Sequence, residues 1–304
     1  MRAPAGMMRI MSHLPHLALV LNAFIWGVSW VPFKWMESLG LSILWATTAS
    51  YLLSSLALIA LRPAVFKGLL SPQSIWWMGL FYGLTNTCFN WALALGDVVR
   101  VVLLFYLMPV WAAIFSRWLL NERLNAEALA RLALALAGAA VVLGQPGEQS
   151  GFADALSIAG GLFFALANVH LRRLEHTQAV QRTMAMFIGS GLVPLFFLLG
   201  AALVAWGYGV DPGGAMRSPL AAEAWAWLAV PLVAVALGLA NFSLQFGGSR
   251  LPTQVTSLIM LSEIVFATVS AAIILGKSLS VAEMIGGACI VLAAVWATLR
   301  PPKH

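Results

Sequence analysis

Ten long apolar stretches, separated by short polar loops, divide this sequence of 304 residues. Each holds about 20 residues, the length that a helix needs to cross the hydrocarbon core of a bilayer. They cover residues 14–36, 41–61, 75–95, 99–120, 126–143, 155–171, 184–206, 225–246, 253–275 and 281–299. Because they are apolar on all sides rather than alternating, the sequence predicts an all-α integral membrane protein with ten transmembrane helices.

The composition excludes several classes of protein. Hydrophobic residues make up 61% of the chain and charged residues 9%, whereas soluble domains average about 45–50% and about 25%. A soluble fold of this length has too little interior to hide so much apolar surface, which argues against a soluble enzyme, a nucleic-acid-binding module and a disordered chain. Cys88 and Cys289 both lie in apolar runs, so we expect no disulfide framework, no metal site and no cofactor.

The placement of basic residues predicts the orientation. With the N-terminus inside, all Lys and Arg residues except Lys34, Arg100, Arg217 and Lys277 fall on or near the cytoplasmic side, as the positive-inside rule requires. An even number of spans returns the C-terminus to the same side. We therefore expect cytoplasmic tails at 1–13 and 300–304 in a bacterial-type inner membrane. The net charge of +6 reflects this asymmetry and not nucleic-acid binding.

The two halves of the sequence align with each other at a constant offset of 155 residues from the third stretch onward. The offset places Asn86 on Asn241 and Asn90 on Gln245, two polar pairs in apolar surroundings. It predicts two five-helix repeats, 14–144 and 153–299. Because five is odd, the second repeat enters the membrane from the opposite side, an architecture typical of secondary transporters that bind substrate between the repeats.

Several motifs resemble the EamA branch of the drug/metabolite transporter superfamily over nearly the whole chain. They are Trp26-Gly27, Met108-Pro109-Val110, Asn121-Glu122-Arg123-Leu124 and Glu263-Ile264-Val265-Phe266. The resemblance implies ten helices, cytoplasmic termini, a central cavity and peripheral fifth and tenth helices. It also implies export of amino acids, other metabolites or drugs, with the aromatic amino acid exporters as the nearest known example.

Buried amides are the first candidates for substrate binding. Asn86 and Asn90 share one helix face, as do Asn241 and Gln245. Amides both donate and accept hydrogen bonds, which suits the ammonium and carboxylate groups of a zwitterion. The alternative is that these amides only join neighbouring helices, at about 0.6 kcal/mol each.

Aromatic residues supply the second group of candidates. Asn22, Trp26 and Trp30 recur every four residues, so they form one face that could bind apolar or cationic groups; lipid-facing or core packing is the alternative. The remaining substrate candidates are Tyr106, Trp111, Phe164 and Asn168, each with a packing alternative. Pro32 and Pro109 can kink their helices and are candidate hinges.

Glu263 is the only acidic residue at the expected membrane depth. A charge there costs at least about 2.5–3.5 kcal/mol. Its carboxyl group is therefore either a protonatable group that couples transport to protons, a counter-charge to a substrate amine, or a structural group that a neighbouring helix satisfies.

The sequence favours a secondary transporter that exports small amphipathic metabolites, most of all aromatic or hydrophobic amino acids, by alternating access. No nucleotide-binding P-loop is present, which excludes ATP-driven transport by this chain alone. Drug export in the same fold is the alternative, and an intramembrane enzyme or a channel are remote ones. The expected partners are a small-molecule substrate, the lipid bilayer and protons, without nucleic acid; the choice between monomer and homodimer stays open.

Overall fold

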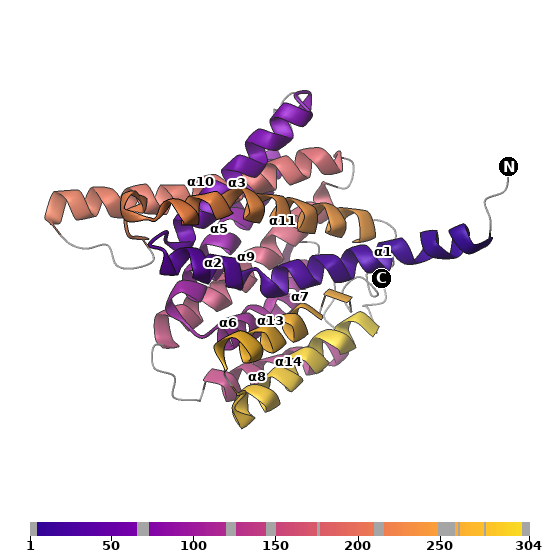
Figure 1. Cartoon of the computed structure of the whole chain (residues 1–304). Coiled ribbons are helices and arrows are strands. Elements are labelled where there is room, and N and C mark those ends of the chain that lie inside the picture. Colours follow the sequence, from indigo (N-terminus) through magenta and orange to yellow (C-terminus); the bar gives the residue numbers. More distant parts are fainter. Residues whose placement is uncertain are drawn as a thin grey trace.

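The computed structural model describes residues 5–65, 73–119, 126–143, 150–174, 177–209, 216–248, 259–260, 262–276 and 278–299. All regular elements in these ranges are helices (Figure 1). They are α1 (Ala5–Val28), α2 (Trp30–Ser38), α3 (Ile43–Leu61), α5 (Gln73–Leu95), α6 (Val98–Phe105), α7 (Met108–Leu119), α8 (Ala126–Leu143), α9 (Ser150–Arg173), α10 (Ala179–Tyr208), the 3₁₀ turn η2 (Pro219–Ala221), α11 (Ala224–Gly248), α13 (Ser262–Leu275) and α14 (Val281–Leu299).

Two of the expected spans are broken rather than continuous. The first is divided into α1 and α2 at Ser29, and the fourth into α6 and α7 at Tyr106 and Leu107. A proline follows each break, Pro32 in the first turn of α2 and Pro109 in the first turn of α7. A proline lacks the N–H that would bond the carbonyl four residues earlier, so a helix can end there and restart at little cost. The candidate hinges therefore lie just after the breaks.

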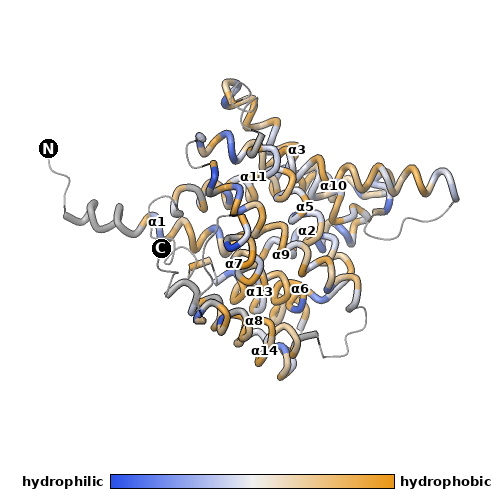
Figure 2. The backbone as a smooth tube through the Cα atoms, turned by 180° about the vertical axis from the view of Figure 1, so that it is seen from behind, coloured by the Kyte–Doolittle hydropathy of each residue, from blue (hydrophilic) through white to orange (hydrophobic). Residues whose placement is uncertain are grey.

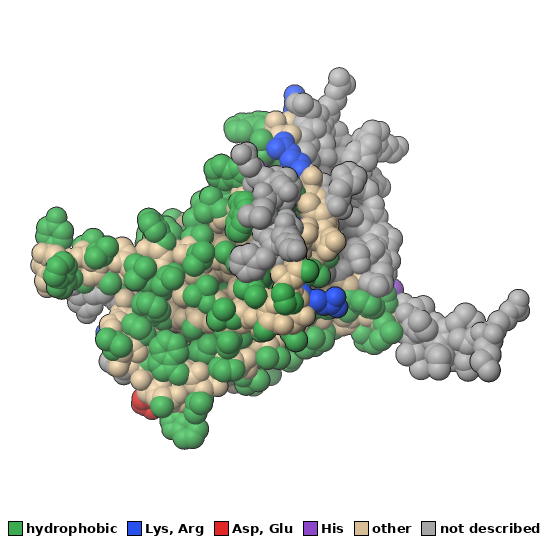
Figure 3. All heavy atoms as spheres, turned by 90° about the horizontal axis from the view of Figure 1, so that it is seen from above, with side chains coloured by type: hydrophobic (Ala, Val, Ile, Leu, Met, Phe, Trp, Pro, Cys, Tyr) green, Lys and Arg blue, Asp and Glu red, His purple; other side chains and the backbone are tan. Residues whose placement is uncertain are grey.

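Apolar residues run along the whole length of the helices (Figure 2). Six helical segments are long and apolar enough to cross a membrane, and three shorter apolar helices accompany them in the described residues. Hydrophobic side chains also cover the outside, and the face in Figure 3 carries few charged groups. Trp35, Trp76, Trp77, Trp118 and Trp206 are exposed near helix ends, as expected for an interfacial belt.

Close helix contacts depend on glycines that leave no room for a side chain. Gly79 and Gly83 of α5 lie directly against the backbone of α10 around Gly189. At the edge of the molecule α8 packs on α14 (Figure 1), where a Cβ on Gly138 would lie 2.6 Å from the carbonyl oxygen of Gly286. Such small-residue contacts let membrane helices approach at backbone distance.

A buried ion pair joins the start of α6 to the start of α9. The Arg100 Nε and Nη2 atoms each lie 2.8 Å from one oxygen of Asp154, and both residues are buried. Asp97 caps α6, since its Oδ1 accepts the backbone N–H of Arg100 at 3.1 Å. Because an isolated charge in such a position is expensive, this paired geometry fixes the two helix ends relative to each other.

Candidate functional site

The carboxyl group of Glu263 lies where three segments meet. Glu263 occupies the first turn of α13, and Gly27 of α1 packs so closely that a Cβ there would lie 2.8 Å from the Glu263 backbone oxygen. Tyr106, in the turn between α6 and α7, is buried, and its hydroxyl lies close enough to the Glu263 carboxyl for the two groups to interact. Among the described residues, no basic side chain pairs with this carboxyl group.

The hydroxyl group of Tyr106 has two acceptors but only one hydrogen. It lies 3.3 Å from the carbonyl oxygen of Met260, just before α13, and it also reaches the Glu263 carboxyl. When Glu263 is protonated, its O–H donates to the tyrosine oxygen, and Tyr106 donates to Met260. When Glu263 is ionised, Tyr106 donates to the carboxylate, and the Met260 carbonyl loses its partner. The protonation state of one acid can thus change contacts between α6, α7 and α13.

The α5 amides hold α5 against two other helices. The Asn86 Oδ1 accepts the Tyr51 hydroxyl at 3.0 Å, and its Nδ2 donates to the Ser190 Oγ at 3.0 Å. The Asn90 Nδ2 donates to the Thr47 Oγ1, also at 3.0 Å. Both amides are buried. These bonds agree with the alternative that the amides join neighbouring helices. Substrate binding by Asn86 and Asn90 stays a prediction.

Asn22 bonds to the α11 backbone at the residue before Asn241, where α1 packs on α11. The Asn22 Nδ2 donates to the Ala240 carbonyl at 2.6 Å, and the Asn241 Nδ2 donates to Leu237 in its own helix at 2.8 Å. The Asn22 Oδ1 is buried without a partner in the described part of the chain. A buried acceptor without a partner is unfavourable by about 1–3 kcal/mol, so this oxygen is available to a ligand that donates a hydrogen bond. The side chain of Gln245 lies outside the described residues.

The aromatic candidates divide between two places. Trp30 is buried and its Nε1 donates to the Ser270 Oγ of α13 at 3.0 Å, whereas Trp26 is only partly buried. On α9, Phe164 packs edge-to-face on Tyr82 at a centroid distance of 6.0 Å, and the Asn168 Oδ1 accepts the Tyr82 hydroxyl at 3.3 Å.

Trp111 and Pro109 both belong to α7. The Trp111 Nε1 is a buried donor that lacks a partner among the described residues. The side chain of Pro109 lies outside the described part. The structure thus brings Tyr106 close to Glu263 and joins Asn22 to the α11 backbone beside Asn241, while the other candidates lie on further helix contacts.

A band of hydroxyl groups on α3 escaped the sequence analysis. Six of the nine residues from 47 to 55 carry a hydroxyl, and all six are buried: Thr47, Thr48, Ser50, Tyr51, Ser54 and Ser55. The hydroxyls of Thr48 and Ser50 have no partner in the described residues. The density of hydroxyl groups inside an apolar run could have identified these residues from the sequence. A membrane helix satisfies its own backbone, so polar side chains on it need a separate explanation.

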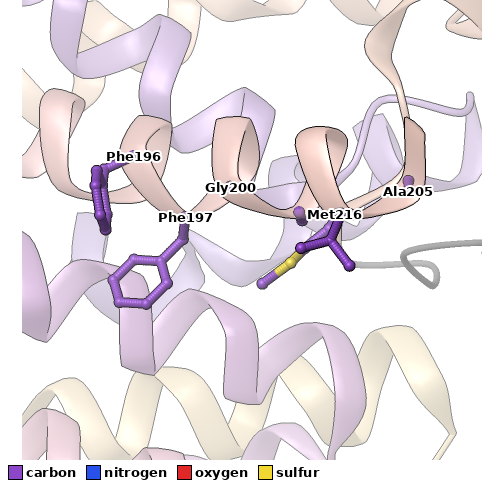
Figure 4. A pocket seen from close by; sticks show the side chains of 7 residues that line it. Phe196, Phe197, Gly200, Ala205 and Met216 are labelled. Carbon is purple, nitrogen blue, oxygen red and sulfur yellow. The ribbon is translucent and has the colours of Figure 1, made fainter. Parts of the chain in front are cut away.

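A pocket of about 330 Å³ lies elsewhere, on the second half of α10 (Figure 4). Its lining is apolar and consists of Phe196, Phe197, Gly200, Ala201, Val204, Ala205 and Met216. None of the predicted substrate residues contributes to it. Nor do the described residues contain a group of three His, Cys, Asp or Glu side chains placed to hold a metal ion.

The comparisons with known proteins agree with this architecture. The sequence pattern of the EamA-like transporter family matches residues 13–144. One crystal structure of a protein, 21% identical in sequence, superposes with a TM-score of 0.61 and covers 94% of this chain and 96% of that chain. At that identity the match shows a shared fold alone, but it extends over both halves. No curated protein is significantly similar to the chain.

The family match and the apolar helices together show a multi-pass membrane protein. The aromatic exporter subtype receives no support from either comparison. Residues 13–144 are thus similar to the EamA-like transporter family, in agreement with the drug/metabolite transporter superfamily that the motifs of the chain resemble.

Proposed function

We propose that the protein is a secondary transporter that exports small amphipathic metabolites by alternating access across the inner membrane, with both termini in the cytoplasm. Amino acids with aromatic or apolar side chains are the leading substrate class. The observation that carries the proposal is the Glu263 carboxyl, which contacts a tyrosine hydroxyl at the meeting point of α1, α13 and the α6–α7 turn. An acid inside apolar helices marks a functional site by default.

The helix boundaries support two repeats. Shifted by 155 residues, α8 falls on 281–298, and α14 runs over Val281–Leu299. The same shift brings the start of α7 at Met108 to position 263, next to the start of α13 at Ser262. Repeats of inverted topology are typical of transporters in which two halves exchange conformations around a shared site.

Two buried polar atoms, one on α1 and one on α7, have no partner in the described residues and are available to a ligand. The Asn22 Oδ1 can accept from an ammonium group, and the Trp111 Nε1 can donate to a carboxylate. Indole rings such as Trp26 can pack on an apolar side chain. Drug export remains the alternative because the same aromatic surroundings suit hydrophobic cations. An intramembrane enzyme and a channel are remote alternatives, because enzymes of that kind commonly use paired acids and channels commonly use rings of residues from several subunits.

Uptake of radiolabelled compounds into proteoliposomes tests the substrate class. Phenylalanine, tryptophan, methionine and threonine form one panel, and hydrophobic cationic drugs form the other. We expect saturable uptake of phenylalanine or methionine that an excess of the unlabelled compound inhibits. Saturable uptake of drugs alone would overturn the amino-acid assignment and keep the transporter.

Glu263→Gln is expected to abolish the response of uptake to a pH gradient. For exchange of one proton per substrate, an interior one pH unit more acidic can support about a tenfold accumulation, and glutamine removes the titrating group while keeping the side-chain shape. The matched control is Glu223→Gln, because Glu223 is exposed. If the pH gradient did not change uptake by the wild-type protein, and the Glu263→Gln variant were equally active, the proposal would be contradicted. The protein would then be a facilitator, and Glu263 would have a structural role.

A further inference from the structure

A second group of polar side chains lies where α5 meets α9 and the beginning of α10. Tyr82 projects from α5 and donates its hydroxyl to the Asn168 Oδ1 of α9 at 3.3 Å. Arg182 lies in the first turns of α10, close enough to Tyr82 for the two groups to interact electrostatically. None of the bonds that hold Glu263 or the amides of α1 and α11 involves this group.

The guanidinium of Arg182 is anchored on one side only. Its Nη1 donates to the carbonyl of Leu174 at 3.1 Å and to the carbonyl and hydroxyl of Thr177, which fixes it to the end of α9. Its Nε is buried and has no hydrogen-bond partner among the described residues. Those residues also provide no carboxylate in an ion pair with it.

Arg100 shows what the free edge of Arg182 is suited to bind. In Arg100 the Nε and Nη2 atoms form parallel hydrogen bonds, each 2.8 Å, to the two oxygens of the Asp154 carboxylate. A guanidinium binds a carboxylate in this way because the spacing of its donors matches that of the two oxygens. In Arg182 the hydrogen bonds to the described residues involve Nη1, so the edge formed by Nε and Nη2 remains available. A buried cationic donor without an acceptor is unfavourable, and a bound carboxylate would remove that penalty.

We propose that Arg182, with Tyr82 beside it, forms a binding subsite for the carboxylate of a small organic acid between α5 and the start of α10. The free N–H groups at the start of α10 favour an anion at the same place. In the proposed topology this end of α10 faces the cytoplasm, the side from which an exporter takes up its substrate. The inference thus deepens the proposed function, and it assigns Arg182 as the first contact for the carboxylate of an amino acid.

Nuclear magnetic resonance of the intact protein, labelled with ¹⁵N at arginine Nε, tests the subsite without any transport assay. The probe is phenylacetate, and phenylacetamide is the uncharged control of the same shape. The Arg182 signal is identified by its loss in the Arg182→Lys variant. We expect phenylacetate, but not phenylacetamide, to shift this signal, while the Nε signal of Arg100 stays in place. No shift, or an equal shift with both compounds, would overturn the proposal.

Two variants complete the test. Arg182→Gln is expected to weaken phenylacetate binding about tenfold or more, because it removes a charge-assisted pair of hydrogen bonds. Glu175, which follows Leu174 in the sequence and lies outside the described residues, supplies the second variant. Glu175→Gln is expected to leave phenylacetate binding unchanged. If phenylacetate shifted the Arg182 signal only in this variant, Glu175 would be the partner of Arg182 and the subsite would not exist. Binding at Arg182 in a protein that transports none of the tested compounds would refute the proposed function and leave the subsite standing.

Discussion

Asp154→Asn is expected to destabilise the protein by about 3–5 kcal/mol, the usual cost of removing one partner from a buried ion pair. Arg100 would keep its charge at a position that is only 8% exposed, and an amide can accept one of its two hydrogen bonds but cannot neutralise it. The carboxylate of Asp97, which caps the same helix beside Arg100, would still offset part of the arginine charge. The loss of stability is therefore expected at the lower end of this range. The measurement is the fraction of monodisperse protein after heating in detergent.

Glu37→Gln is the matched control for this change. Glu37 pairs with Lys34 at 3.2 Å, but both side chains are partly exposed, and such pairs contribute about 0–1 kcal/mol. The double variant Arg100→Met with Asp154→Leu is expected to recover most of the lost stability, because it leaves no unpaired charge. Equal losses for Asp154→Asn and Glu37→Gln would contradict the buried position of the Arg100 pair.

Gly189→Ala is expected to destabilise the contact between α5 and α10 by about 1–3 kcal/mol or more, the range for overfilling a packed interior. The added Cβ would overlap the backbone of Gly79, and backbone atoms cannot turn away as a flexible side chain can. The two helices would have to separate, which would also strain the bond between Asn86 and Ser190. Thermal stability in detergent measures the loss.

Gly200→Ala is the matched control, because Gly200 also lies on α10 but does not contact α5. No atom lies within 4 Å of a Cβ placed there, so Gly200→Ala is expected to be neutral or to stabilise by up to about 1 kcal/mol through helix propensity. If Gly189→Ala and Gly200→Ala had the same melting temperature, the close approach of α5 to α10 would be wrong.

The apolar pattern predicted where helices lie better than how they are divided. The expected stretches 41–61 and 281–299 correspond to α3 at Ile43–Leu61 and to α14 at Val281–Leu299. The breaks at Ser29 and Tyr106 were not predicted as breaks, because a proline shows which backbone bond is missing but not which residue ends the helix. For the stretch 253–275, the described helix α13 begins only at Ser262, and residues 253–258 lie outside the described part.

The sequence identified single residues of the candidate site but not their pairing. Glu263 was singled out by its charge and Tyr106 by its hydroxyl, yet they are 157 positions apart, and only the packing of α13 on α6 brings them together. Arg100 was likewise placed on the outer side without its partner Asp154. Long-range pairs of this kind depend on the arrangement of the helices, which a pattern of apolar residues does not specify.

Counterflow in proteoliposomes tests most directly whether the protein is a carrier. Vesicles are loaded with an unlabelled compound that shows saturable uptake, phenylalanine first, and are diluted into a trace of the labelled compound. A carrier that alternates between two faces exchanges one for the other, so label should rise transiently above its equilibrium level, in Glu263→Gln as well because exchange needs no proton. Label that only approaches equilibrium, without overshoot, would mean a channel and would contradict alternating access.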